Sequence, residues 1–305
     1  MRKQKEDGFT ARKRGFDGVS GILALSDEDT KRLKDTLLSM FRDFRRVTAK
    51  EKIFYTLSGG SVLGAVRHEG FIPWDDDIDV NMPRADFERF KQVFSRELGD
   101  RYVLTTPLMT PGHGMTLVQM KKKGTICRSY NELSKPDDQC GVAIDFFIIE
   151  NVFDALPLRL MQGALSLLAG YLVSARKTWE DLPYLKPYME ESETVAAMFA
   201  KKARIGRLFR FIPLDTAARI AGKIYAMCPD DRSEYVSIPT GRKHFFGETY
   251  KRRDICRRIP AKFEGLTVPV PAEWQSYLTT LYGPDYMVLP PEGKREHHPL
   301  MELRL

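Results

Sequence analysis

Four aspartates within five positions, Asp75, Asp76, Asp77 and Asp79, are the side chains of this sequence best suited to chemistry. They lie in the run FIPWDDDIDV at 71–80, between bulky apolar residues. Carboxylates this close repel one another, and burying them is costly unless a cation compensates. Oxygen ligands suit Mg²⁺ or Mn²⁺, and these metals commonly handle phosphate. The alternative interpretation is a solvated acidic loop, which the apolar flanks disfavour.

Two strand patterns hold these and one further carboxylate. The order Asp-Ile-Asp-Val at 77–80 alternates with a period of two, which predicts a strand with Asp77 and Asp79 on one face. The run VAIDFFII at 142–149 is typical of a buried strand and has a single charge, Asp145. An aspartate there is expensive without a cation or hydrogen bonds. The alternative is a structural aspartate paired with a buried arginine.

A glycine-rich turn precedes the acidic run. An apolar strand predicted at 53–57 leads into Ser58-Gly59-Gly60-Ser61, and a helix is predicted at 61–67. Strand, glycine turn and helix present backbone N–H groups to a phosphate, although most such turns are only turns. A glycine turn, an Asp-x-Asp strand and a later lone aspartate are together what metal-dependent phosphoryl or nucleotidyl transfer requires.

The order and spacing of these features resemble the polymerase-beta-like nucleotidyltransferase superfamily. More narrowly, 58–90 resembles the LicD family, through GGSVLGAVRH at 59–68 and GFIPWDDDIDV at 70–80, with further likeness at 143–146 and 277–292. The resemblance implies a transferase that moves phosphocholine, or a related alcohol phosphate, from a CDP-activated donor such as CDP-choline. The acceptor would be a hydroxyl of a cell-surface glycan, such as teichoic acid or lipopolysaccharide, or of a lipid-linked saccharide, and CMP would be released.

The resemblance also implies roles for individual carboxylates. Asp77, Asp79 and Asp145 would bind Mg²⁺ or Mn²⁺, and Asp145 would be the candidate general base. Trp74, Asp75 and Asp76 would support these ligands from outside.

Donor binding is implied for residues of the turn and the following helix. Gly59, Gly60 and Ser61 would contact the donor phosphate, and Arg67 and His68 would stabilise its negative charge. A surface cation is the alternative for Arg67, and a capping or packing histidine is the alternative for His68.

The same chemistry leaves two other functions open. A nucleotidyltransferase that uses CTP and releases pyrophosphate would need the same three aspartates. A non-catalytic module that binds metal or nucleic acid is the other alternative, which the lack of a recognition motif disfavours. Near the C-terminus, His297 and His298 either fold back over the site or belong to a frayed end.

Composition indicates the kind of partner, the cell compartment and the regions to expect for this chain. The 305 residues include 48 Lys and Arg against 41 Asp and Glu, a net charge of +7, which favours anionic partners such as nucleotides or a membrane surface. The four cysteines form no C-x-x-C pair, which is typical of a reducing cytoplasm, so we expect a cytoplasmic protein, with the inner face of the membrane as an option. The predicted regions are a basic tail (1–25), a catalytic core (26–150) and an acceptor-side region (151–305).

The elements that must position these side chains follow from periodicity. Helices are predicted at 27–50 and 84–98, and strands at 102–105, 115–121 and 125–130. The predicted fold class is α/β (α+β): a small, mixed, twisted nucleotidyltransferase-like sheet flanked by helices, with a mainly helical C-terminal portion. There, 156–175 is predicted as a buried helix, with an interfacial helix lying on a bilayer as the alternative, and 176–188 as a loop or broken helix.

Overall fold

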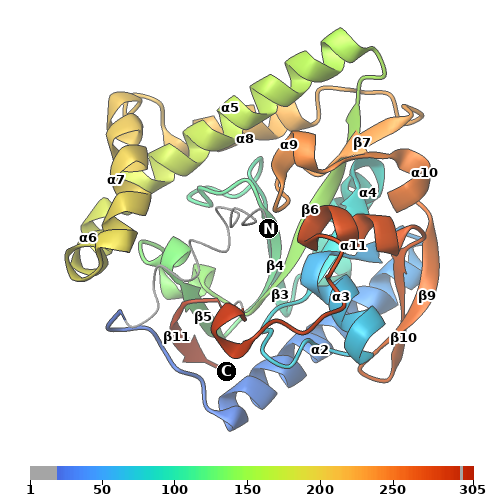
Figure 1. Ribbon diagram of the computed structural model, residues 1–305, viewed down its shortest axis with the longest axis horizontal. Helices are drawn as coiled ribbons and strands as arrows, with labels where there is room; N and C mark the ends of the chain where they lie inside the picture. The colour runs from blue at the N-terminus through green and yellow to red at the C-terminus, as the bar shows by residue number, and fades with distance from the viewer. Residues whose placement is uncertain (1–18, 296–297) are drawn as a thin grey trace.

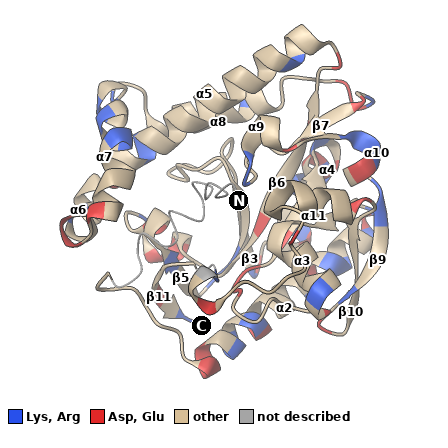
Figure 2. Cartoon of the chain, in the orientation of Figure 1, with Lys and Arg blue, Asp and Glu red and all other residues tan. Residues whose placement is uncertain are grey.

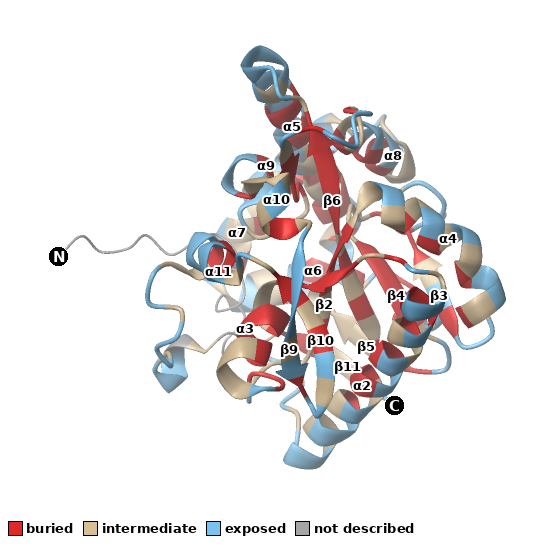
Figure 3. Cartoon of the chain, turned by 90° about the vertical axis from the view of Figure 1, so that its right-hand side faces the viewer, coloured by how far each residue is buried: buried red, intermediate tan, exposed pale blue. Residues whose placement is uncertain are grey.

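The chain has a mixed α+β fold, as predicted, in a computed structural model that describes residues 19–295 and 298–305 (Figure 1). Its main sheet has seven strands: β1 (Thr56–Leu57), β2 (Asp79–Pro83), β3 (Tyr102–Thr105), β4 (Val118–Lys122), β6 (Ala143–Val152), β7 (Tyr235–Ser237) and β8 (Thr249–Lys251). The order is β1-β2-β6-β4-β3, and β7 pairs with the end of β6 and with β8. Among the described strand pairs, β2 and β6 alone run parallel. Figure 3 shows both as buried strands.

Two predicted helices supply one wall of the core. Helix α2 (Asp27–Lys50) begins at Ser26, whose Oγ accepts from the Asp29 N–H at 3.0 Å. Helix α4 (Arg84–Leu98) follows β2 directly. Their aromatic side chains meet the sheet: the Phe44 ring lies 5.4 Å from that of Phe90 and 5.3 Å from that of Phe146, in edge-to-face contact. This packing fixes β6, and with it Asp145.

Other elements surround the ends of β1 and β2. Helix α3 (Gly59–His68) and helix α11 (Trp274–Tyr282) contact each other, and the hairpin of β9 (Arg258–Phe263) and β10 (Leu266–Pro271) packs beside α3 and β1. Strand β11 (Leu300–Arg304) pairs with β5 (Ile126–Ser129), which brings residues near the C-terminus to the core. Three 3₁₀ turns complete this part: η1 (Tyr130–Glu132), η2 (Asp137–Gln139) and η3 (Glu292–Lys294).

The portion after β6 is mainly helical, as predicted. It contains α5 (Leu156–Glu180), α6 (Leu182–Glu191), α7 (Glu193–Leu208), α8 (Leu214–Tyr225), α9 (His244–Gly247) and α10 (Arg252–Ile255). The broken helix predicted at 176–188 is confirmed, because α5 ends at Glu180, Asp181 interrupts the helix and α6 begins at Leu182. Arg176 and Lys177 are buried and paired in the last turns of α5, with Arg176 Nε donating to the Ile212 carbonyl at 2.9 Å. Pro183 falls in the first turn of α6, where no backbone N–H is needed.

Two expectations need correction. The helix expected to be buried at 156–175 is buried along only one side in its first part, where eight large apolar side chains of sixteen residues are exposed. Of the tail expected at 1–25, residues 1–18 lie outside the described residues, whereas Val19 is buried in a cluster with Leu185, Val195 and Phe199. The chain from Val19 onward is therefore packed against α6 and α7.

Candidate active site

Asp79 and Asp145 lie side by side on the two parallel strands. The register pairs Asp79 with Asp145 at the start of the β2–β6 ladder, and the Asp145 N–H donates to the Ile78 carbonyl at 3.1 Å. Paired residues on neighbouring strands point to the same face, so both carboxylates share one side of the sheet. Two carboxylates that are 66 positions apart in the chain therefore lie next to each other in the sheet.

Asp77 is not on the predicted strand. The strand begins at Asp79, and Asp77 belongs to an irregular segment after a turn in which the Asp75 N–H donates to the Ile72 carbonyl at 2.9 Å. By the same register Asp77 would face Ala143, the first residue of β6, but the pairing of β2 with β6 starts only at Asp79 and Asp145. The Asp77 charge nevertheless acts on Asp145. The predicted trio is thus brought together, with Asp77 reaching it from a loop.

A second group of ligand atoms adjoins the trio. Asp75, Asp76, Asp77 and His298 each offer one atom, and these atoms lie within 4.8 Å of one another; we refer to these four residues as the acidic cluster. His298 Nδ1 lies 2.6 Å from Asp76 Oδ1, and its Nε2 lies 3.5 Å from Asp77 Oδ2. His298 therefore folds back onto the site, whereas His297 lies outside the described residues.

The glycine turn, residues 58–61, begins α3 directly at Gly59, and we refer to it as the glycine corner. The N-cap residue Ser58 makes no side-chain cap hydrogen bond, so the backbone N–H groups after Gly59 in the first turn favour an anion. Gly59 is left-handed, with φ of +46°, and a Cβ on Gly60 would lie 2.8 Å from Asp75 Oδ2. The predicted Ser61 has an additional structural role, because its buried Oγ accepts from the Asp79 N–H at 2.9 Å.

Tyr277 of α11 forms hydrogen bonds with the glycine corner and with β2. Its buried hydroxyl lies 3.1 Å from the Gly59 N–H nitrogen, 3.2 Å from Asn81 Nδ2 and 3.0 Å from Ser58 Oγ. Both nitrogens are donors, so the hydroxyl accepts from them and donates its own proton to Ser58 Oγ. Tyr277 therefore connects α3, β2 and α11 through one buried atom.

Arg67 and His68 are engaged with each other and with the chain. Arg67 Nη1 donates to the Tyr286 carbonyl at 2.8 Å, and its Nε donates to His68 Nε2 at 2.9 Å. Burial and the Arg67 charge lower the pKa of His68, so the imidazole is neutral and accepts. These contacts fit the structural alternative for His68 and give Arg67 a structural role, while its charge still lies close to Asp75.

The electrostatics of the site centre on Asp145. Burial raises the pKa of Asp145 to about 6, and the Asp77 charge adds to the rise, against an opposing hydrogen bond from Gln119 Nε2 at 2.8 Å. Lys34 of α2 donates to the Pro73 carbonyl at 2.8 Å and lies within electrostatic range of Asp75 and Asp76. The arginine pairing considered for Asp145 is replaced by the Gln119 hydrogen bond, which leaves a concentration of negative charge suited to a cation.

Aromatic rings border the site on two sides. The Tyr282 hydroxyl approaches Gly59 and Gly60, and the Arg242 guanidinium lies 5.2 Å from the Tyr282 ring centroid. Burial raises the pKa of Tyr282 well above its usual value, so the phenol keeps its proton. The predicted Trp74 is half-buried, with the Arg295 guanidinium 4.6 Å from its ring centroid.

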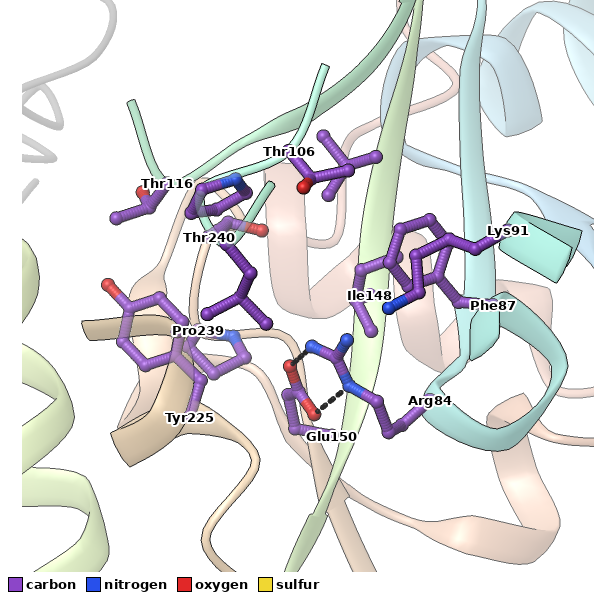
Figure 4. Close-up of a pocket in the computed structure, with 14 residues that line it drawn as sticks. Arg84, Phe87, Lys91, Thr106, Thr116, Ile148, Glu150, Tyr225, Pro239 and Thr240 are labelled. Atoms are coloured by element: carbon purple, nitrogen blue, oxygen red, sulfur yellow. Dashed lines mark hydrogen bonds and ion pairs between the residues drawn. The ribbon is translucent and has the colours of Figure 1, made fainter. Parts of the chain in front are cut away.

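A small enclosed cavity lies elsewhere, between α4, the end of β6 and α8 (Figure 4). Its volume is about 20 Å³, which is enough for one water but not for a nucleotide. The buried Glu150 carboxylate and Arg84 form an ion pair at its floor. This cavity is therefore a packing feature behind the site.

Sequence reasoning missed several residues that shape the site. Gln119 carried a signal, since it is a polar residue inside a predicted apolar strand. Tyr277 and Tyr282 lie in the stretch 277–292 that resembles the family, but Lys34 and Arg242 carried no signal, because their roles depend on how distant elements pack.

The carboxylates present fit a hard divalent cation. Asp77, Asp79 and Asp145 offer oxygen ligands, and the acidic cluster offers more, with Asp77 common to both groups. Burial raises the pKa of Asp145 and the Asp77 charge adds to the rise, and a bound cation would oppose both effects by favouring the ionised carboxylate.

Known proteins resemble this chain in the region of the site. Residues 52–136 match the family described as "LicD/FKTN/FKRP, nucleotidyltransferase domain". Over 272 residues the chain is 26% identical to a Haemophilus influenzae protein named "Lipopolysaccharide cholinephosphotransferase LicD". The aligned region covers 87% of this chain and 94% of that protein.

Shorter segments match other proteins. An uncharacterized protein of Rickettsia typhi is 34% identical over 87 residues, or 26% of this chain and 28% of that protein. The human protein named "Ribitol 5-phosphate transferase FKRP" is 44% identical over 45 residues, or 15% of this chain and 9% of that protein.

Proposed function

The chain is a member of the LicD family and a transferase enzyme, and from this premise we propose that it moves phosphocholine from CDP-choline to a hydroxyl of a cell-surface glycan. CMP would be the leaving group. The name of the Haemophilus influenzae relative supports choline as the head group and lipopolysaccharide as the kind of acceptor. The name of the human relative makes an alditol phosphate the second donor to test.

One observation carries the proposal: Asp79 and Asp145 are paired on parallel strands beside the glycine corner, with Asp77 acting on Asp145. In this mechanism the backbone N–H groups at the start of α3 bind the donor phosphate. The acceptor oxygen attacks phosphorus, the bond from phosphorus to the CMP oxygen breaks, and the acceptor proton passes to Asp145. Asp145 would take this proton as the general base; without a cation, burial raises its pKa to about 6, so it is mostly ionised at neutral pH.

Asp77, Asp79 and Asp145 would hold Mg²⁺ or Mn²⁺. When bound, the cation would neutralise charge on the phosphate oxygens and on the leaving group. Trp74, Asp75 and Asp76 would keep this loop in place, through the Ile72–Asp75 turn and the contact of Asp76 with His298.

The test is a product assay with the purified full chain, a lipopolysaccharide or teichoic acid acceptor, and CDP-choline, CDP-ribitol or CTP as donor. We expect CMP release from a CDP-alcohol that stops in excess EDTA. Asp145→Asn should lower the rate by about 10²- to 10⁴-fold, the usual contribution of a general base. Asp138→Asn, at an exposed carboxylate in η2, is the matched control and should retain full activity.

Two results would contradict the proposal. Pyrophosphate release from CTP, with no CMP from any CDP-alcohol, would identify a nucleotidyltransferase instead. Full activity in excess EDTA would show that the reaction needs no divalent metal.

A further inference from the structure

The first part of α5 presents a continuous apolar surface to solvent. Its large exposed side chains are Leu156, Leu158, Leu160, Met161, Leu165, Leu167, Leu168 and Tyr171, which we call the apolar face. Leu168 is 68% exposed and Leu156 56% exposed. Figure 3 shows this end of α5 projecting beyond the end of β6. Soluble surfaces rarely gather so many large apolar side chains on one helix without a partner.

The apolar face carries no charge. Arg159 is the one charged residue of 156–171, and its guanidinium is turned onto the Tyr235 ring of β7, 4.0 Å from the centroid. On the opposite side of the helix, buried Gln162 donates to the Asn151 carbonyl at 2.9 Å and receives the Phe153 N–H. The helix is thus fixed to the protein along one side and exposed along the other.

By length and composition α5 is the one described helix that could cross a membrane, but its packing argues for a different arrangement. Val173, Ala175, Arg176 and Lys177 are buried inside the protein, so only 156–171 is accessible. Sixteen residues at a rise of about 1.5 Å span about 24 Å, which is shorter than a hydrocarbon core of about 30 Å. A helix held sideways in this way can lie in a bilayer surface but cannot span it.

Positive charge is concentrated on two helices that pack against α5. Helices α7 and α8 pack against α5, and residues 194–228 contain seven cations and a single acid, Asp215. The cations are Lys201, Lys202, Arg204, Arg207, Arg210, Arg219 and Lys223. Arg204, Arg207 and Arg210 line an open hollow together with the exposed Leu208 and Phe211. Figure 2 shows basic residues gathered on α7 and acidic residues on α6.

We infer that the apolar face and these cations dock the protein on an anionic phospholipid bilayer, with the start of α5 lying in the headgroup region. The leucines would enter the acyl boundary while the arginines and lysines of α7 and α8 reach anionic headgroups. Each cation near such a surface adds to the attraction, and salt screens this contribution. This inference concerns where the enzyme binds and does not depend on which donor it uses.

Vesicle co-sedimentation of the purified full chain tests it. We expect binding to vesicles of phosphatidylglycerol and phosphatidylcholine, with at least tenfold weaker binding to phosphatidylcholine alone and weaker binding at high salt. The double variant Leu160→Glu, Leu168→Glu should lose at least tenfold in binding to both kinds of vesicle. Arg204→Glu with Arg207→Glu should lose only the preference for anionic lipid. Ile259→Glu, an exposed apolar residue of β9, should bind as the wild type does.

Circular dichroism identifies any variant that has not folded, and the charge-reversal pair tests the inference even if the leucine variant fails. Wild-type protein that ignores anionic vesicles would overturn the inference. A soluble dimer that Leu168→Glu dissociates, in a protein that binds no vesicles, would instead show that a second copy covers the face.

Discussion

At Gly60 the backbone and a carboxylate approach more closely than any side chain would allow. A Cβ there would lie 2.8 Å from Asp75 Oδ2, within the van der Waals distance. Gly60 does not have the left-handed backbone that its neighbour Gly59 adopts, so alanine suits the backbone at position 60 and conflicts only with Asp75.

Gly60→Ala should therefore reduce activity more than stability. The methyl group displaces the Asp75 carboxylate and narrows the approach of a phosphate to the start of α3, and we expect at least a tenfold loss in kcat/KM. The melting temperature should change little, because alanine favours a helix over glycine by about 1 kcal/mol and this gain offsets the displacement of the Asp75 carboxylate. Steady-state CMP release and thermal unfolding measure the two effects.

Glycine-to-alanine substitutions at two other positions separate the effect on the site from the effect on the backbone. Gly293→Ala, where a Cβ would meet open space, should leave both measurements unchanged. Gly59→Ala should lower stability as well, since its φ of +46° strains an L-residue. A fully active Gly60→Ala variant would show that the glycine corner does not receive the donor.

Among the elements, α11 supports the site although it contacts no reacting group in the proposed mechanism. Its Tyr277 hydroxyl satisfies the Gly59 N–H and the Asn81 amide in a buried position. Unpaired buried donors cost free energy, so this helix should contribute to the geometry of the corner as well as to the core.

Tyr277→Phe should cost about 1–3 kcal/mol of unfolding free energy, because it leaves two buried donors without an acceptor. Chemical denaturation monitored by circular dichroism measures this. Tyr184→Phe removes a hydroxyl from a 50% exposed tyrosine of α6 and should be neutral. Equal stability of Tyr277→Phe and wild type would mean that water replaces the lost hydroxyl.

Periodicity predicted the elements whose burial pattern is local. Helices α2 and α4 and strand β3 have the predicted bounds, because each shows a regular apolar period and a clear start. The pattern failed where long-range contacts decide. Asp77 lies outside the predicted strand, because β2 pairs with β6 only from Asp79 and Asp145 onward.

At the scale of the whole molecule, buried carboxylates make stability depend on pH. Burial raises the pKa of Glu248 to about 7, although its carboxylate accepts from the Lys243 N–H at 2.7 Å. The folded state therefore binds this proton more tightly than the unfolded state. The contribution of Glu248 to stability is full below about pH 4.5 and is lost as pH rises to about 7.

Glu248→Gln removes this titration and should change the pH profile of unfolding. Relative to the wild type, the variant should gain on the order of 2 kcal/mol between pH 5 and pH 8. Urea unfolding at four pH values measures the difference, and Glu190→Gln, at an exposed position of α6, is the control. Parallel profiles for Glu248→Gln and wild type would mean that Glu248 is ionised throughout.

The candidate site was predictable where its residues are close in sequence. The glycine corner and the acidic run lie within 22 positions, and their spacing alone indicated phosphate chemistry. Asp145 was found as a lone charge in a buried strand. The role of Lys34 could not be predicted, because nothing in its local sequence indicates which distant surface it meets, and the family likeness at 277–292 did not indicate what Tyr277 and Tyr282 contact.

The contact between Asp76 and His298 joins residues 222 positions apart. A ribosome adds about 5–20 residues per second, so roughly ten to forty seconds of translation separate the two side chains. By the end of that interval, before His298 is added, the nascent chain contains every strand of the main sheet and all three predicted metal ligands. A polypeptide terminated shortly before codon 298 would therefore hold the proposed catalytic carboxylates and lack the imidazole that contacts two of the cluster's aspartates.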